Sequence, residues 1–237
     1  WLLTANPQLA ALITEVIGDD WITNLDRVRE LEPFAGDMAF QDRFRAAKLS
    51  NKKRLAKWIR RTMGESVNAE SLFDVHVKRI HEYKRQLLNV LHIIHEYLRL
   101  TEDGVLPAQP RTYVFSGKAA PGYYLAKQII ELIHDVAREI NQNPRCKGLL
   151  KVCFLPDYRV SLAQIVIPAA DLSEQISTAG TEASGTSNMK FAMNGALTMG
   201  TLDGANIEIR EAVGADNFFL FGHTVEEIRT LQRNGHR

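Results

Sequence analysis

From residue 71 onward, the chain alternates between short apolar runs and longer amphipathic segments. The short runs predict six β-strands, at residues 72–77, 112–117, 149–155, 171–178, 196–201 and 217–222. Strands that alternate with helices in this way are typical of a parallel sheet, so the sequence predicts an α/β fold. Sheets of this kind bind ligands at the carboxyl ends of their strands, where turns lead into helices.

The helices between these strands are predicted from apolar residues at helical spacing. One stripe, within residues 78–100, consists of Tyr83, Leu87, Leu91, Ile94 and Leu98, and a second, within residues 117–140, consists of Leu125, Ile129, Leu132, Val136 and Ile140. Shorter helices are expected at residues 188–195 and 205–214, and residues 157–170 are interpreted as a mixed connection. A β-hairpin across Asp203-Gly204 is the local alternative to the last of these helices.

The first seventy residues are predicted to be helical. Residues 6–18 carry one apolar stripe that Gly18 can close, and residues 42–64 form a second, strongly basic helix that includes Lys48 and Lys52. A nucleic-acid-binding arm is one interpretation, but a solvated helix face is favoured because the rest of the chain supplies matching acidic charge. We therefore expect a helical lead-in over residues 1–70 that packs on a domain formed by residues 71–237.

Composition narrows the class of protein. The 29 basic residues balance 28 acidic ones, so the overall charge gives no reason to expect nucleic acid or an anionic membrane as partner. No apolar run approaches the roughly 20 residues of a membrane span. The two cysteines, Cys146 and Cys153, favour a reducing, cytoplasmic location. The chain begins at Trp1 and stops soon after a helical pattern starts at residue 224, so we expect a fragment of a longer protein.

The stretch GTEASGTSNMKFAMNG, residues 180–195, nearly matches the phosphate-binding loop G-x-x-x-x-G-K-[ST]. Gly180 and Gly185 have the required spacing, but Thr186 stands where the lysine should be, and Lys190 follows four residues later. Free amides before a helix favour an anion, and Lys190 in the first helical turn among apolar neighbours is disfavoured as an ammonium ion. An anion-binding turn beside a nucleophilic amine suits pyridoxal phosphate, and a surface lysine after a capped turn is the simpler alternative.

A second cluster, VKRIHEYKR at residues 77–85, follows the first predicted strand. Its turn is crowded with cations and rings: Lys78, Arg79, His81, Tyr83, Lys84 and Arg85. Four cations could bind one or two phosphate groups, although taken alone they are explained as well by a solvated turn. Because this turn and the one at Gly185 both follow strands, we expect them to face each other across one cleft.

Other motifs are weaker. SGKAAPGYY, residues 116–124, again has glycines five apart, but a tight strand-to-helix turn with Pro121 near the helix start explains it as well. The dinucleotide pattern G-x-G-x-x-G is absent from the sequence, and Ser184 lacks the flanking glycines of a nucleophile elbow. His92 and His95 share a helix face without an evident third ligand, so no metal is expected.

Five motifs in order carry a more specific signal: VKRIHEYKRQLLN, SGKAAPGYY, LPDYRVSLA, IPAADLSEQ and STAGTEASGTSNMKFAMNGALTMGTLDGANIEI. Together they closely resemble the α-glucan phosphorylases, the family of glycogen, starch and maltodextrin phosphorylases, over essentially the whole chain. The resemblance implies most of the second, Rossmann-like domain of a GT-B glycosyltransferase fold, truncated at its C-terminus and without the N-terminal domain. It also implies pyridoxal 5′-phosphate as cofactor.

The resemblance assigns roles residue by residue. Lys190 would form the Schiff base with pyridoxal phosphate. The cofactor's phosphate and ring would contact Lys78, Thr186, Ser187, Tyr158 and Arg159. The substrate phosphate would bind Arg79 and Lys84, and the glucosyl unit would contact Tyr83, Glu182, Ala183, Ser184 and Gly185. Lys78, Arg79 and Lys84 would be the catalytic cations, because they neutralise two phosphate groups that lie close together and stabilise the charged transition state.

The implied reaction is reversible phosphorolysis, in which inorganic phosphate removes a terminal α-1,4-linked glucose from the glucan as glucose 1-phosphate. The family's active site lies between two domains, so we expect little or no activity from this chain alone, and the full protein is expected to be a homodimer. Two alternatives remain: a transferase that uses a nucleotide sugar, and a non-catalytic fragment that binds only anions or sugars.

One position departs from the family pattern GTGNMK, because Ser187 replaces the glycine. If the position needs a positive φ angle, serine is strained there. If it needs only a free amide at a helix start, serine is suitable. We favour the second interpretation and do not expect the change to inactivate the protein.

Overall fold

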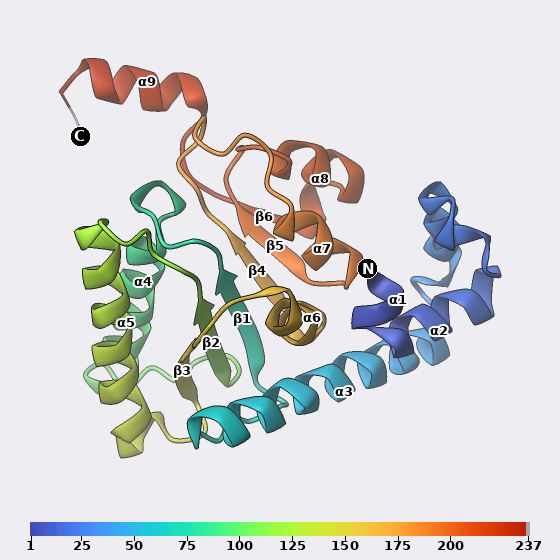
Figure 1. Ribbon diagram of the computed structural model, residues 1–237, viewed down its shortest axis with the longest axis horizontal. Helices are drawn as coiled ribbons and strands as arrows, with labels where there is room; N and C mark the ends of the chain where they lie inside the picture. Colours follow the sequence, from blue (N-terminus) through green and yellow to red (C-terminus); the bar gives the residue numbers. More distant parts are fainter. Residues whose placement is uncertain (236–237) are drawn as a thin grey trace.

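The computed structural model describes residues 1–235 and contains a six-stranded parallel sheet (Figure 1). In chain order the strands are β1 (Leu72–Val77), β2 (Arg111–Ser116), β3 (Leu150–Leu155), β4 (Leu172–Gln175), β5 (Leu197–Gly200) and β6 (Phe218–Leu220). In space their order is β3-β2-β1-β4-β5-β6. This is the doubly wound order of a Rossmann-like sheet, so the predicted α/β class is confirmed.

A helix follows every strand. These helices are α4 (Gln86–Thr101), α5 (Tyr124–Gln142), α6 (Val160–Ala169), α7 (Ser187–Met193), α8 (Asn206–Val213) and α9 (Val225–Arg233). The interpretation of residues 157–170 as a mixed connection is wrong, because α6 is helical and apolar on most sides where it lies between the sheet and the N-terminal helices. The hairpin across Asp203-Gly204 is also excluded, since β5 and β6 are parallel neighbours joined through α8.

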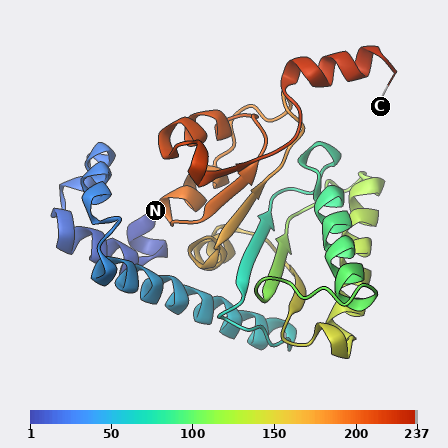
Figure 2. The same ribbon diagram turned by 180° about the vertical axis from the view of Figure 1, so that it is seen from behind.

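Two hydrophobic cores lie on opposite faces of the sheet. Alternate residues of β1 serve the two faces: Phe73, Val75 and Val77 pack with α6, whereas His76 lies under α4, where its ring pairs with Asn89. The second core joins α4 and α5 to β2 and β3. Figures 1 and 2 show α4 and α5 together on one side of the sheet and α6 on the other.

The apolar stripe predicted for α4 is wrong. Leu87, Leu91 and Leu98 are exposed, and the buried residues are Gln86, Asn89, Val90, Ile93 and Leu100. The helix begins only at Gln86, because a short 3-10 turn (Glu82–Lys84) and a left-handed Arg85 precede it. Burial of polar residues is compensated by the neighbouring turn, since the Gln86 side chain donates a hydrogen bond to the Arg79 carbonyl at 3.1 Å.

The stripe predicted for α5 is correct in part. Ile129 and Ile140 are buried and Leu132 and Val136 partly so, whereas Leu125 is exposed. The remaining buried positions are taken by Ala126, Ile133 and Ala137, so the inward face is rotated from the predicted one. Pro121 lies three residues before the helix start at Tyr124, so it belongs to the preceding turn and not to the first helical position.

The first seventy residues are helical, as predicted. They form α1 (Leu2–Ala5), α2 (Pro7–Ile17), which ends at Gly18, two 3-10 segments (Asp20–Ile22 and Leu25–Phe34) and the long α3 (Met38–Met63). A third, smaller core joins α1 and α2 to Trp21. α3 packs on α6 through Leu55 and Ile59, so the lead-in helices lie against the sheet domain. The division into domains at residue 70 stays a prediction.

The basic side of α3 is not simply a solvated face, so that interpretation is wrong for two of its lysines. The Lys48 ammonium donates hydrogen bonds to the carbonyls of Pro168, Ala170 and Asn194 at 3.2, 2.6 and 2.8 Å. Lys52 is buried and bonds the Ser71 carbonyl and the Asp171 carboxylate. Lys48 therefore holds α3 against the C-terminal ends of α6 and α7, and Lys52 holds it against the residues that precede β1 and β4.

Cys146 and Cys153 are buried free thiols. Among the described residues, no helix is both long and apolar enough to cross a membrane.

Candidate active site

A cleft of about 800 Å³ lies at the carboxyl ends of the central strands, where the strand order reverses between β1 and β4. Its walls come from the turns after β1, β3 and β4 and from the first turns of α6 and α7. This is the place where doubly wound sheets bind their ligands. The prediction that the turn at residues 78–85 faces the turn at Gly185 across one cleft is confirmed.

Most of the residues to which the sequence assigns a role line this cleft. They are Lys78, Arg79, Tyr83, Lys84, Tyr158, Arg159, Glu182, Gly185, Thr186, Ser187 and Lys190. Ala183 and Ser184 are exposed in the same loop and do not line it. Arg85, one of the four cations of the second cluster, turns away to bond the Ile176 carbonyl and to stack over Phe221, so it has a structural contact instead.

The cleft is strongly cationic although the chain as a whole is nearly neutral. Five cationic side chains line it, Lys78, Arg79, Lys84, Arg159 and Lys190, against one carboxylate, that of Glu182. The full chain has only one more basic than acidic residue. Such a local excess of positive charge favours anions, and a concave wall strengthens the field.

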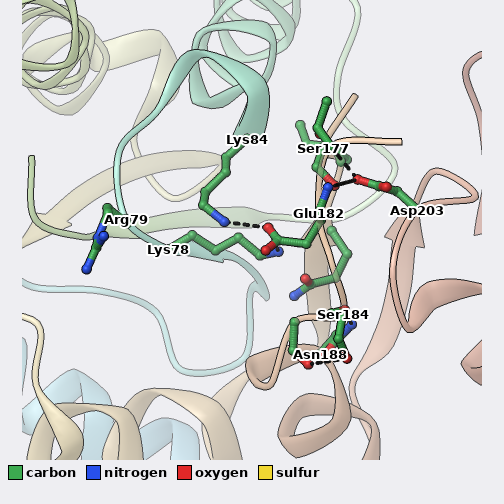
Figure 3. Close-up of polar contacts among 12 residues, drawn as sticks. Lys78, Arg79, Lys84, Ser177, Glu182, Ser184, Asn188 and Asp203 are labelled. Atoms are coloured by element: carbon green, nitrogen blue, oxygen red, sulfur yellow. Dashed lines mark hydrogen bonds and ion pairs between the residues drawn. The ribbon is translucent and has the colours of Figure 1, made fainter. Parts of the chain in front are cut away.

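Glu182 lies between two of the lysines (Figure 3). Its carboxylate accepts a hydrogen bond from Lys84 and lies 4.0 Å from the Lys78 ammonium, whereas Arg79 points to the other side. Burial lowers the pKa of Lys78 to about 8, and the Glu182 charge opposes that shift. For Lys84 burial is the largest single influence and lowers the pKa, but the hydrogen bonds and charges of Glu182 and Tyr83 together outweigh it, so the net direction is upward.

In the first half of the loop that resembles a phosphate-binding motif, the backbone amides already bind a carboxylate side chain of the protein itself. Asp203, which follows β5, accepts hydrogen bonds from the backbone amides of Gly180 and Glu182 at 2.9 and 3.0 Å. It also accepts one from the Ser177 hydroxyl. The amides at the Gly180 end of the loop therefore bind an internal carboxylate and are not free for an external phosphate group.

The second half of that loop is open to the cleft. Within residues 1–235, the amides of Thr186 and Ser187 donate no hydrogen bond, and α7 begins at Ser187. Ser187 does not have a positive φ angle, so the position requires only a free amide at a helix start, as favoured above. Lys190, one turn further on, lines the cleft, and its ammonium lies 5.5 Å from the centre of the Trp1 ring.

The SGKAAPGYY segment supports the turn after β1. A side chain at Gly117 would place its Cβ 1.9 Å from the Lys78 carbonyl oxygen, so only glycine permits this approach. The Tyr123 hydroxyl donates a hydrogen bond to the Glu82 carboxylate, and the His81 ring packs between Tyr83 and Tyr123 with centroids 4.6 and 4.9 Å apart. The weak third motif therefore positions cationic residues and does not itself line the cleft.

The turn after β3 supplies an apolar wall with a cationic rim. Tyr158 is half-buried against the core beneath α6, and burial raises the pKa of its phenol to about 12, so the ring is neutral at physiological pH. Ala163 and Ile167 of α6 extend the same wall. Arg159 is exposed at the rim, where it pairs with Asp157 at 3.3 Å. A flat apolar ring can pack on this side while an anionic group reaches the opposite one.

Sequence reasoning missed the residues behind the loop. Asp203, Gly204 and Asn206 line no part of the cleft, but Asp203 and Gly204 contact the segment between β4 and α7, and Asn206 contacts the end of β4 and the first turn of α7. The available signal is the Asp203-Gly204 pair between an expected strand and an expected helix, for which a hairpin is the only alternative considered above. Its function could not be read from spacing, because the contacts join residues about twenty positions apart.

The fold and the cleft define a class, a Rossmann-like α/β protein with a cationic cleft at its switch point. Over residues 1–237 the sequence matches the family model described as Carbohydrate phosphorylase, so the chain belongs to that family. It is 57% identical over its whole length to a glycogen phosphorylase of Haemophilus influenzae, and 56% identical to those of Synechocystis and Bacillus subtilis over 100% and 99% of the chain. It spans only 28–29% of the length of these relatives. The family resemblance is thereby confirmed.

Proposed function

We propose that this chain is the cofactor-binding part of an α-1,4-glucan phosphorylase, which uses inorganic phosphate to release terminal glucose as glucose 1-phosphate. The observation that carries the proposal is the concentration of five cations in one cleft of a nearly neutral chain. A site for two phosphate groups needs such an excess, because two adjacent dianions repel each other strongly. The names of the relatives support this choice of reaction.

The residues present fit pyridoxal 5′-phosphate. Lys190 brings a primary amine into the cleft, and the Thr186 and Ser187 amides have no protein acceptor within the described chain. The Tyr158 ring with Ala163 offers an apolar surface for the pyridine ring. The cleft volume of about 800 Å³ lies in the range of small-molecule sites.

We assign Lys190 to the covalent link with the cofactor's aldehyde. Its phosphate and ring would be held by Lys78, Thr186, Ser187, Tyr158 and Arg159. When bound, pyridoxal phosphate would supply a phosphate group that assists proton transfer to the glycosidic oxygen. The cofactor's phosphate would thus take part in the chemistry, and the Lys190 amine would only attach the cofactor to the protein.

The other residues to which the sequence assigns a role would bind the substrate. Arg79 and Lys84 would hold its phosphate, and Tyr83, Glu182, Ala183, Ser184 and Gly185 would contact the glucosyl unit. The side chain of Lys78 is only 9% exposed, and its ammonium has no hydrogen-bond acceptor within residues 1–235, so an incoming phosphate oxygen would provide one. The three catalytic cations would act by neutralising charge as the phosphate groups approach each other.

The reaction is proposed for the whole protein. Because the chain spans less than a third of the length of its relatives, we expect little or no glucose 1-phosphate release from the 237 residues alone. Measurable release by the purified chain would contradict that expectation and would also exclude a fragment that only binds anions or sugars. For the whole protein we propose a cytoplasmic homodimer that acts on glycogen or maltodextrin.

A labelling experiment tests the cofactor assignment. The chain is incubated with pyridoxal phosphate, reduced with borohydride and digested, and the labelled peptide is identified by mass spectrometry. We expect label on the peptide that contains Lys190 and complete loss of that label in Lys190→Ala. Lys127→Ala, which removes an exposed lysine of α5, is the matched control and should leave the labelling unchanged. Label spread evenly over surface lysines would count against the assignment.

A further inference from the structure

One buried carboxylate organises the loop between β4 and α7. Asp203 is 3% exposed and lies where β5 leaves the sheet, behind the cleft. Besides the two backbone amides and the Ser177 hydroxyl, the Thr181 hydroxyl approaches its carboxylate at 3.4 Å. The two amides and the Ser177 hydroxyl make charge-assisted hydrogen bonds to this anion and fix residues 177–182 at several points (Figure 3). The hydrogen of the Thr181 hydroxyl is directed to the Thr178 carbonyl, so its contact with Asp203 is weaker.

The neighbours of Asp203 continue the same support. Gly204 lies so close to the loop that a Cβ there would be 2.5 Å from the Ser184 carbonyl oxygen, and that oxygen accepts a hydrogen bond from Ala205 N at 2.8 Å. The Asn206 side chain accepts one from Asn188 at 3.3 Å and donates to the Gln175 carbonyl at 2.9 Å. Residues 203–206 therefore contact the loop from its first turn to the start of α7.

We propose that Asp203 is a positioning residue of the cleft, because its carboxylate fixes the backbone from which Glu182 reaches Lys84 and Lys78. The Glu182 amide bonds Asp203 on one side while its side chain bonds Lys84 on the other, so the loop links the carboxylate to the cations. Without this anchor, Glu182 and the start of α7 lose their fixed distance from the turn after β1. The inference rests on the proposed function only in taking the ligand of those cations to be a phosphate group.

The substitution Asp203→Asn distinguishes this positioning role from a role in packing alone. The side chain keeps its size, but one of its oxygens becomes an NH₂ group that faces donors, so at least one bond to the loop is lost. We expect Asp203→Asn to weaken the binding of inorganic phosphate, measured by ³¹P NMR titration, about tenfold. The same variant should accelerate hydrogen exchange of the Gly180 and Glu182 amides about tenfold or more relative to the amides of β1–β3.

Two controls separate positioning from general destabilisation. Asp216→Asn makes the same chemical change at an exposed position after α8 and should leave both measurements unchanged. Ile133→Val weakens the core under α5, and after it the phosphate affinity should persist even though thermal stability falls. If Asp203→Asn changes phosphate affinity and loop exchange less than twofold, the inference is wrong.

The wild-type chain gives a test that no folding failure can obscure. Hydrogen exchange read amide by amide should show Gly180 and Glu182 protected, whereas Thr186 and Ser187, which have no acceptor in the described chain, exchange freely until phosphate is added. Equal rates at Glu182 and Thr186 would overturn the role of Asp203. Absence of phosphate binding together with absence of label at Lys190 would instead refute the proposed function, and the protection of Gly180 and Glu182 would be unaffected by that outcome.

Discussion

Two partly buried lysines, Lys48 on α3 and Lys78 after β1, have the same lowered pKa and different surroundings. Burial is the main cause of the shift at both, and it brings each pKa to about 8. The Lys48 ammonium has three carbonyl acceptors at 2.6–3.2 Å, one for each of its N–H donors. Among the described residues, the Lys78 ammonium has only the Glu182 carboxylate nearby, at 4.0 Å, and it faces an open cleft.

Burial and a shifted pKa therefore do not distinguish a structural lysine from a ligand-binding one. The difference lies in whether the protein itself provides the hydrogen-bond acceptors that the ammonium needs. Where it does, as at Lys48, the charge holds helices together. Where it does not, as at Lys78, an anion from outside completes the site.

Lys48→Met should lower the free energy of unfolding by about 3 kcal/mol, because three carbonyls at the ends of α6 and α7 lose their donor. Chemical denaturation measures this loss. The matched control is Lys53→Met, which removes an exposed lysine of the same helix and should change stability by less than about 0.5 kcal/mol. A loss below about 1 kcal/mol in Lys48→Met would mean that the three contacts contribute little.

Lys78→Met should have the opposite profile. The affinity for inorganic phosphate, measured by ³¹P NMR, should fall about tenfold or more, since one charge-assisted hydrogen bond is lost. Stability should stay the same or rise slightly, because an ammonium without acceptors is replaced by an apolar side chain of similar length. Lys127→Met serves as the control on the surface. A loss of stability as large as that in Lys48→Met would show that Lys78 is structural as well.

Phosphate affinity should also depend on pH through Lys78. The anion prefers the protonated ammonium, and in the free protein the pKa of Lys78 is about 8. Affinity should therefore fall, by up to about tenfold per pH unit, as pH rises through and above that value. Inorganic phosphate is predominantly the dianion in that range, so the fall in affinity reports on the protein. In Lys78→Met the fall should disappear, and a slope identical to that of wild type would assign the pH dependence to another group.

The smallest expected effect is that of Ser187→Gly. The position has an ordinary backbone angle and contributes an amide at the start of α7, which glycine also provides. We expect phosphate affinity within about twofold of wild type and a stability loss of no more than about 1 kcal/mol, from the greater freedom of glycine in the unfolded chain. A large gain in phosphate affinity would show that the serine side chain hinders the ligand.

Much of the fold follows from local pattern. The sequence predicts all six strands within a few residues and helices after five of them. The reason is that the spacing of apolar residues differs between strands and helices and can be recognised within each segment. Which side of α4 faces inward was not predictable in this way. The sequence offers two apolar faces there, and the polar pair Gln86 and Asn89 is buried because partners from β1 and its turn satisfy them.

The candidate site, like the fold, is predictable from the sequence only in part. The sequence by itself determined that cationic and glycine-rich turns follow neighbouring strands, and the order of parallel strands then required those turns to meet in one cleft. Only the tertiary structure decided which lysine is bound by carbonyls and which faces the cleft. It also decided that Asp203 binds the first half of the loop that resembles a phosphate-binding motif. These partners are determined by hydrogen bonds between residues far apart in the chain, and the local spacing of residues does not predict such bonds.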